Sequence, residues 1–105
     1  MNRMLGMLGL CARARRLITG EKAVVQAVRA GSAHAVLLDG AAAPNAVQAV
    51  SRACGTHGVP LVRTAPLALG EAIGKPGRMA AAVTDPGMAE RLLALAGEAA
   101  PQDNP

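Results

Sequence analysis

The stretch LITGEKAVVQAVRAGSAHAVLLDG, residues 17–40, predicts a short extended piece, a helix and a buried strand in that order. Its middle part, residues 21–30, places valines on one side and a polar stripe on the other, which is the pattern of an amphipathic helix. Gly31 follows, as glycine often does after the end of a helix. Residues 35–38 are a continuous apolar run, typical of a strand that is buried on both faces.

The same alternation of helices and strands continues on both sides of this stretch. Before it, residues 2–13 repeat apolar side chains at helical spacing. Gly6 and Gly9 weaken this helix, so we expect either close packing at the glycines or a helix held by tertiary contacts. After it, the pattern predicts a helix that starts at Pro44 and is stopped by Gly55, a strand at 59–62, a helix at 67–73, a turn at 75–78, a strand at 79–83, and a helix that starts at Asp85-Pro86. We therefore expect an α/β fold built as a three-layer α/β/α sandwich.

Length and composition predict one globular domain. The chain has 105 residues, and we expect the domain to span residues 1–97 with residues 98–105 as a flexible tail. Phe, Tyr and Trp are absent, so the core must be aliphatic. The same absence excludes the aromatic platforms on which many single-strand nucleic-acid readers stack bases. Any recognition of nucleic acid must therefore use shape, phosphate contacts or polar contacts to bases.

The charge of the chain is unevenly distributed. The formal net charge is +4, and residues 1–30 contain six Lys or Arg residues against one Glu. The last third of the chain is mildly acidic. A basic N-terminal part fits a protein that binds a polyanion, and the alternative is an ordinary solvated surface.

The cysteines and histidines do not suggest a metal site. Cys11 and Cys54 are far apart and form no CxxC pair, so we expect buried free thiols in a reducing cytoplasm rather than a disulfide. Cys54 and His57 have the spacing of half a zinc site, but the sequence offers no second half. We therefore expect no bound metal.

The sequence also gives little support for a catalytic site, a nucleotide-binding loop or a membrane span. The acidic residues are scattered singly, and no Ser-His-Asp or Cys-His arrangement suggests itself. Residues 70–75, GEAIGK, are one spacer short of a phosphate-binding loop and lack the hydroxyl that would hold magnesium. No apolar run approaches the about 18 residues that cross a bilayer. We expect a protein that is not an enzyme, needs no cofactor and has no membrane partner.

A basic cluster near the N-terminus is the leading candidate site. Arg13, Arg15 and Arg16 come shortly before Gly20, which opens the helix at residues 21–30. A helix N-terminus offers N–H groups to an anion, and a glycine there leaves room for a phosphate or a base edge. The exposed face of the same helix adds polar candidates, namely Glu21, Lys22, Gln26 and Arg29. This set could grip an RNA backbone, and the alternative is a glycine cap with routine surface charges.

The order and spacing of several segments resemble a known family. The run R-x-R-R-L-I-T-G-E-K is followed by V-x-x-A-V-R-A-G and A-V-L-L-D, and later by G-V-P-L-V, L-G-E-A-I-G-K and A-A-V-T-D-P-G-M-A. Together they resemble the kink-turn-binding ribosomal protein superfamily of the L-seven-Ae/L-thirty-e type. Within it the chain is most similar to the small bacterial YlxQ-type ribosomal proteins. The match covers about residues 3–96.

The resemblance implies a four-stranded mixed sheet between helices and binding to structured RNA without a cofactor. It makes ribosomal RNA the first candidate partner and ribosomal proteins further candidates, and we expect a monomer. In such proteins RNA is held by the glycine-led start of the second helix, the loop after the first long buried strand and the loop before the last strand. Carried over to this chain, these residues are Gly20, Glu21, Lys22 and Gln26, then Asp39, then Gly74, Lys75 and Arg78.

The match departs from the family's pattern at the base-reading residues. Archaeal kink-turn binders typically place Asn-Glu after the glycine, with Lys three residues past that Glu, whereas this chain has Lys22, Ala23 and Gln26. The sequence therefore predicts RNA binding without that base-reading pair. Two other function classes stay open: a protein-interaction module of the same fold, and an accessory-domain-like relative of an RNA-modifying enzyme.

Overall fold

The computed structural model describes residues 2–99, with the side chains of residues 2–97. Its elements, in chain order, are α1 (Arg3–Arg13), β1 (Leu17–Thr19), α2 (Glu21–Arg29), β2 (Ala35–Asp39), α3 (Pro44–His57), β3 (Leu61–Thr64), α4 (Ala68–Ile73), β4 (Ala80–Val83) and α5 (Pro86–Ala99). In this part of the chain they form five helices and one four-stranded mixed sheet. The predicted α/β fold is confirmed.

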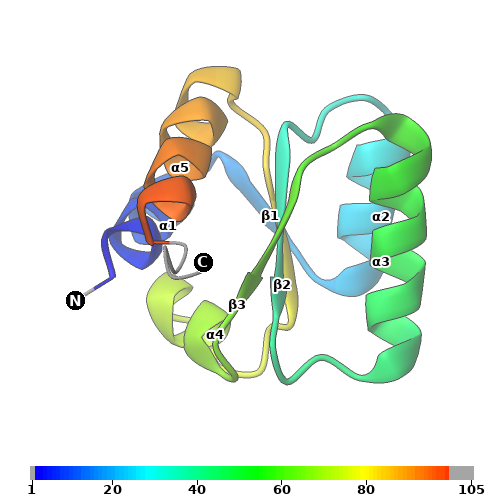
Figure 1. The fold of residues 1–105 in the computed structure, drawn as a ribbon, viewed down its shortest axis with the longest axis horizontal. Coiled ribbons are helices and arrows are strands. Elements are labelled where there is room, and N and C mark those ends of the chain that lie inside the picture. The colour runs from blue at the N-terminus through cyan, green and yellow to red at the C-terminus, as the bar shows by residue number, and fades with distance from the viewer. Residues whose placement is uncertain (1, 100–105) are drawn as a thin grey trace.

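The directions of the strands bring several loops to one end of the sheet. The strand order is β1-β4-β2-β3, with β2 parallel to β3 and β4 antiparallel to both β1 and β2. The C-terminal ends of β1, β2 and β3 therefore lie beside the start of β4. We call this end of the sheet, the lower one in Figure 1, the loop end; it holds Thr19, Asp39, Thr64 and Ala80. The opposite end, where β1 begins and β4 finishes, is called the far end.

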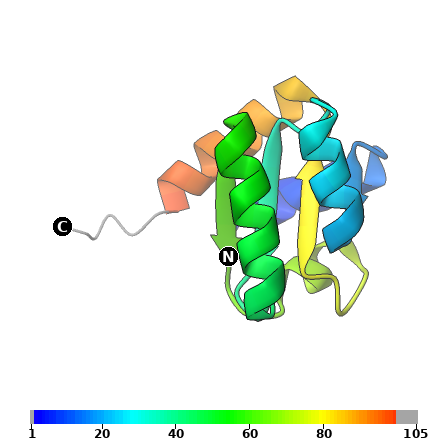
Figure 2. The same ribbon diagram turned by 90° about the vertical axis from the view of Figure 1, so that its right-hand side faces the viewer.

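The sheet separates two layers of helices. α1, α4 and α5 cover one face, and α2 and α3 lie side by side on the other (Figures 1 and 2). β2 is buried on both faces: Leu37 belongs to the core under α1, α4 and α5, whereas Val36 and Leu38 belong to the core under α2 and α3. Both cores consist of aliphatic and sulfur-containing side chains, as the composition requires.

The predicted end of α3 is wrong. The helix starts at Pro44 as expected, but it continues through Gly55 to His57, and Gly58 caps its C-terminus in a left-handed conformation. A single interior glycine costs a helix only about 1 kcal/mol relative to alanine. The buried side chains of α3, which include Val50 and Cys54, offset that cost by packing against the sheet.

Two further boundaries differ from the prediction. β3 begins at Leu61 rather than at residue 59, because Pro60 has no N–H for the ladder and contributes only its carbonyl, which accepts from Val36. α5 extends to Ala99, so the predicted start of the tail at residue 98 falls within a helix. The remaining predicted tail, residues 100–105, lies outside the described residues.

Arg15 lies in the turn after α1 in a left-handed conformation, with φ of 59°. Its side chain is exposed, and glycine usually takes such a position because it has no Cβ. Arg15→Gly is therefore expected to raise the free energy of unfolding by about 0.5–1 kcal/mol. Thermal denaturation beside Arg16→Gly, whose parent residue has no positive φ, measures the effect. An Arg15 variant that loses as much stability as this control would contradict the expectation.

Candidate nucleic-acid interface

Gly20 joins β1 to α2 at the loop end of the sheet. Its backbone angles, φ 101° and ψ 141°, are rarely adopted by residues with a side chain. Its N–H donates to the carbonyl of Ala80 at 3.0 Å, which ties the start of α2 to the start of β4. No side chain caps α2, so the N–H groups of its first turn have no side-chain acceptor. The prediction that a glycine opens this helix is confirmed.

Arg78, in the loop before β4, lies next to Gly20. A Cβ atom placed on Gly20 would be 3.6 Å from the guanidinium Nη1 of Arg78. The cation therefore lies in van der Waals range of the start of α2, where the helix dipole already attracts anions. Two segments that are distant in the chain thus place a cation beside a helix N-terminus.

The loop that carries Lys75 and Arg78 is closely packed on α4. The N–H of Lys75 donates to the carbonyl of Gly70 at 2.9 Å, and the N–H of Arg78 donates to the carbonyl of Lys75 at 3.2 Å. A Cβ on Gly70 would lie 2.7 Å from the Lys75 carbonyl oxygen, so this approach requires glycine. Because the backbone is held in place, both exposed cations start from fixed positions. Gly74, which ends α4, directs the chain into this loop.

The exposed side of α2 continues from this surface. Glu21 and Lys22 belong to its first turn, and Gln26 follows one turn further along. All three side chains are exposed, whereas Val24 on the opposite side of the helix is buried. The predicted polar stripe is therefore present, and its beginning lies at the loop end.

The N-terminal arginine cluster is divided by the fold. Arg15 and Arg16 precede β1 and lie at the far end of the sheet, where the carbonyl of Arg16 accepts the N–H of Thr84 at 2.9 Å. Arg29 finishes α2 and lies toward the same far end. The sequence grouped Arg15 and Arg16 with Gly20 because only the three-residue strand β1 lies between them and the glycine. A strand of this length still carries the chain about 10 Å, at about 3.3 Å per residue.

Asp39 is fully buried, and its predicted role as a direct RNA contact is corrected. Its Oδ1 accepts hydrogen bonds from the hydroxyl of Thr64 and the N–H of Leu69, each at 3.0 Å. Its Oδ2 accepts from the N–H of Leu67 at 2.7 Å and that of Ala41 at 2.9 Å. With two hydrogen bonds on each oxygen, the carboxylate has no exposed atom to offer a ligand.

The pKa of Asp39 reflects two opposing effects. Burial alone would raise the pKa of this carboxyl. The hydrogen bonds from the backbone of Leu69, Ala41 and Leu67 and from the hydroxyl of Thr64 outweigh burial and lower the pKa. The ionised carboxylate thus joins the segments that follow β2 and β3. Asp39 positions the loop end instead of contacting a ligand.

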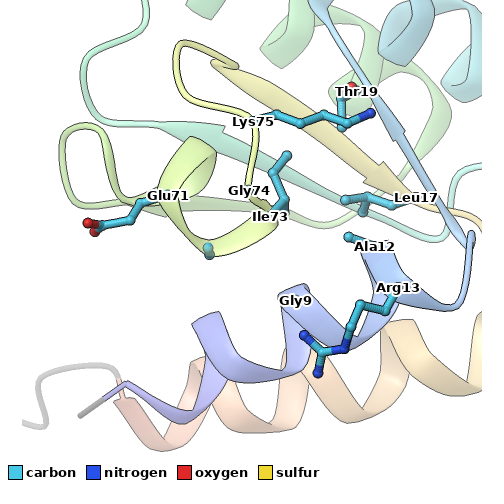
Figure 3. Close-up of a pocket in the computed structure, with 10 residues that line it drawn as sticks. Gly9, Ala12, Arg13, Leu17, Thr19, Glu71, Ile73, Gly74 and Lys75 are labelled. Atoms are coloured by element: carbon cyan, nitrogen blue, oxygen red, sulfur yellow. The ribbon is translucent and has the colours of Figure 1, made fainter.

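A cavity of about 400 Å³ opens between α1, β1 and the end of α4. Figure 3 shows Lys75 extending toward Thr19 at one side of this cavity and Arg13 at the other, with Leu17 and Ile73 between them. Three predicted site residues, Arg13, Gly74 and Lys75, therefore meet at one cavity.

Several lining residues of this cavity had no functional prediction. For Gly9 the sequence predicted no more than close packing, and the packing is found: a Cβ on Gly9 would lie 3.1 Å from the carbonyl oxygen of Ala72 in α4. The second glycine of α1, Gly6, has no such neighbour. Thr19 and Glu71 also line the cavity, and nothing in their sequence surroundings distinguishes them. They line the cavity only because α1, β1 and α4 lie close together in the fold.

Other kinds of site are not found in the described part of the chain. Residues 2–97 contain no group of three His, Cys, Asp or Glu side chains that could hold a metal ion. Cys11 and Cys54 are buried free thiols, as predicted, and burial raises the pKa of each. None of the described helices is both long and apolar enough to span a membrane.

The model of the ribosomal protein L7Ae/L30e/S12e/Gadd45 family matches residues 2–93. The RNA-binding protein YlxQ of Bacillus subtilis (strain 168) is 39% identical over 90 residues, which are 85% of this chain and 90% of that protein.

Two solved structures have the same architecture. A protein with unknown function from Bacillus halodurans C aligns with a TM-score of 0.87 and 37% identity, over 92% of this chain and 99% of that one. The Giardia lamblia 15.5kD RNA binding protein aligns with a TM-score of 0.72 over 90% of this chain and 82% of that one. The Giardia protein is only 22% identical, so this likeness bears on the fold alone.

Proposed function

Because the chain belongs to the ribosomal protein L7Ae/L30e/S12e/Gadd45 family, as its sequence motifs predicted, we propose that it binds RNA through the loop end of its sheet. The observation that carries this proposal is the meeting of Arg78 with Gly20 at the start of α2. A helix N-terminus and a guanidinium side by side attract the same phosphate group.

The proposed contact residues come from two segments. They are Gly20, Glu21, Lys22 and Gln26 from α2 and its start, and Gly74, Lys75 and Arg78 from the loop before β4. Asp39 is left out because it is buried, and Arg15, Arg16 and Arg29 are left out because they lie toward the far end. Phosphate contacts of this kind position a protein on RNA, and Gln26 and Glu21 are the polar side chains able to reach base edges.

The composition favours a folded RNA as the partner. The full sequence contains no Phe, Tyr or Trp on which unpaired bases could stack. A helical RNA, by contrast, is recognised largely by its shape and its phosphates. We propose ribosomal RNA as the first candidate, with kink-turns among the structures to be tested and ribosomal proteins as neighbours. We place this binding function, without catalysis, in the cytoplasm.

The salt dependence of RNA affinity tests this proposal. If Lys22, Lys75 and Arg78 each neutralise one phosphate, the logarithm of the association constant should fall with the logarithm of the salt concentration with a slope of about −2.7. The affinity then falls about 40-fold between 50 and 200 mM salt. Fluorescence anisotropy with a labelled kink-turn RNA and a straight duplex of equal length measures both quantities. An affinity that is independent of salt on both RNAs would contradict the proposal.

A second experiment separates RNA binding from a protein-interaction role. The tagged chain is used to recover partners from a cell extract with and without ribonuclease. RNA binding predicts that the recovered material is lost after ribonuclease or at high salt. A partner that survives both treatments would favour the protein-interaction module.

A further inference from the structure

The cavity beside Lys75 is lined by apolar, cationic and hydroxyl-bearing side chains. Leu17 and Ile73 form an apolar side between α1, β1 and α4 (Figure 3). Arg13 and Lys75 supply a cation on each of two sides, and Thr19 supplies a hydroxyl. A site with an apolar wall and a few converging polar groups is the usual form of a small-molecule site.

The charges of the cavity favour an anionic ligand. Arg13 and Lys75 outnumber the one acidic lining residue, Glu71, whose carboxylate points away from the apolar wall in Figure 3. Within the described residues, none of these three side chains forms an ion pair or a hydrogen bond. Both cations are therefore available to a phosphate group.

The size of the cavity restricts the ligand further. A volume of about 400 Å³ lies at the lower end of the range for small-molecule sites, about 300–1,000 Å³. One base with its sugar and phosphate fills such a space, whereas two stacked nucleotides exceed it. The cavity also shares Lys75 with the proposed RNA surface, so it lies at the border of that surface.

We propose that this cavity binds a single nucleotide. Its base lies against Leu17 and Ile73, and its phosphate is held by Arg13 or Lys75. The nucleotide has two possible sources, an unpaired nucleotide of the bound RNA or a free mononucleotide. The first source rests on the proposed RNA-binding function, and the second is independent of it.

The experiment compares two kinds of probe. The first pair is an RNA duplex with one bulged nucleotide and the same duplex fully paired. The second is each of AMP, GMP, CMP and UMP alone. For the native chain we expect about tenfold tighter binding of the bulged duplex, or saturable binding of at least one mononucleotide.

Two cavity variants and one matched control test the placement. Arg13→Glu reverses a cavity charge, and Ala12→Leu narrows the cavity without changing charge; Arg91→Glu makes the same charge change as the first variant on the exposed side of α5. Both cavity variants should reduce the bulge preference or the mononucleotide affinity at least fivefold. The control should change the affinity of the bulged and the paired duplex equally. Circular dichroism confirms that each variant is folded.

Failure of this proposal is distinguishable from failure of RNA binding. Suppose that the paired duplex binds, but that the two cavity variants change neither the preference for the bulged duplex nor the affinity for any mononucleotide. The cavity proposal is then overturned and RNA binding stands. If no RNA binds and a mononucleotide does so in an Arg13-dependent way, RNA binding fails and the cavity proposal stands in its free-nucleotide form. If no probe of either kind binds, both are overturned.

Discussion

Asp39→Asn is expected to lower the free energy of unfolding by about 3 kcal/mol, a large share of the about 5–15 kcal/mol that stabilises a domain. Each carboxylate oxygen of Asp39 accepts two hydrogen bonds, from the Thr64 hydroxyl and three backbone N–H groups. An asparagine side chain has only one oxygen. Whichever way its amide is turned, the NH₂ group faces two donors, two hydrogen bonds are lost and buried polar groups are left unsatisfied.

Chemical denaturation of the native chain and the variant measures this loss. Asp85→Asn is the matched control, because its carboxylate accepts one hydrogen bond, from Gly87, in an exposed setting. The control should cost less than about 1 kcal/mol, and Thr64→Val, which removes one hydrogen bond of the Asp39 network, should lie between the two. An Asp39 variant as stable as the Asp85 control would show that the network contributes little.

The lowered pKa of Asp39 also fixes the sign of a pH effect. The carboxyl is ionised at lower pH in the folded chain than in the unfolded chain, so the network contributes its full stability above the ordinary carboxyl pKa of about 3.9. This contribution is lost as the pH falls below about 4 and through the folded-state pKa. The Asp39→Asn variant should lose less stability than the native chain over the same acid range, as measured by denaturation at a series of pH values.

The second large effect is expected for the double charge reversal Lys22→Glu with Arg78→Glu. These residues flank the start of α2 at the loop end, and both are exposed. Reversal removes two phosphate contacts and adds repulsion, so RNA affinity should fall about 100-fold near 100 mM salt. The slope of log K against log salt should become shallower by about two units. Fluorescence anisotropy measures both changes.

The far end of the sheet provides a control with the same change in net charge. Arg16→Glu with Arg29→Glu uses two arginines that the sequence grouped with Gly20 and that the fold places away from it. At 0.15 M salt the Debye length is about 8 Å, so charges at the far end act weakly on RNA bound at the loop end. The control should lose less than about fivefold in affinity. Equal losses for the two double variants would mean that net charge alone governs binding.

The fold was predictable because the apolar patterns of most elements agree with their burial. The run at residues 35–38 is continuous because β2 is covered on both faces, and the stripe that contains Val24 and Val28 is the buried side of α2. The errors at α3 and β3 have local causes. Gly55 is tolerated within a helix that packing holds, and Pro60 delays the start of the strand.

The candidate site could be outlined from the sequence only where its proposed residues are close in the chain. Gly20 and Lys22 follow from a helix start, and the family resemblance supplied Arg78. Asp39 was misjudged because three of its four donors are backbone N–H groups, which have no signature in the sequence. The cavity beside Lys75 was missed because α1, β1 and α4 line it together, and their approach depends on the whole fold.

The most direct test of RNA binding at the loop end is an NMR titration of the isotope-labelled chain with a structured RNA. The backbone N–H signals of residues 20–22 and of Gly74, Lys75, Gly77 and Arg78 should shift together and saturate, while those of Arg15, Arg16 and Arg29 should remain nearly unchanged. Shifts confined to the far end of the sheet, or no shifts with any structured RNA, would contradict the proposed interface.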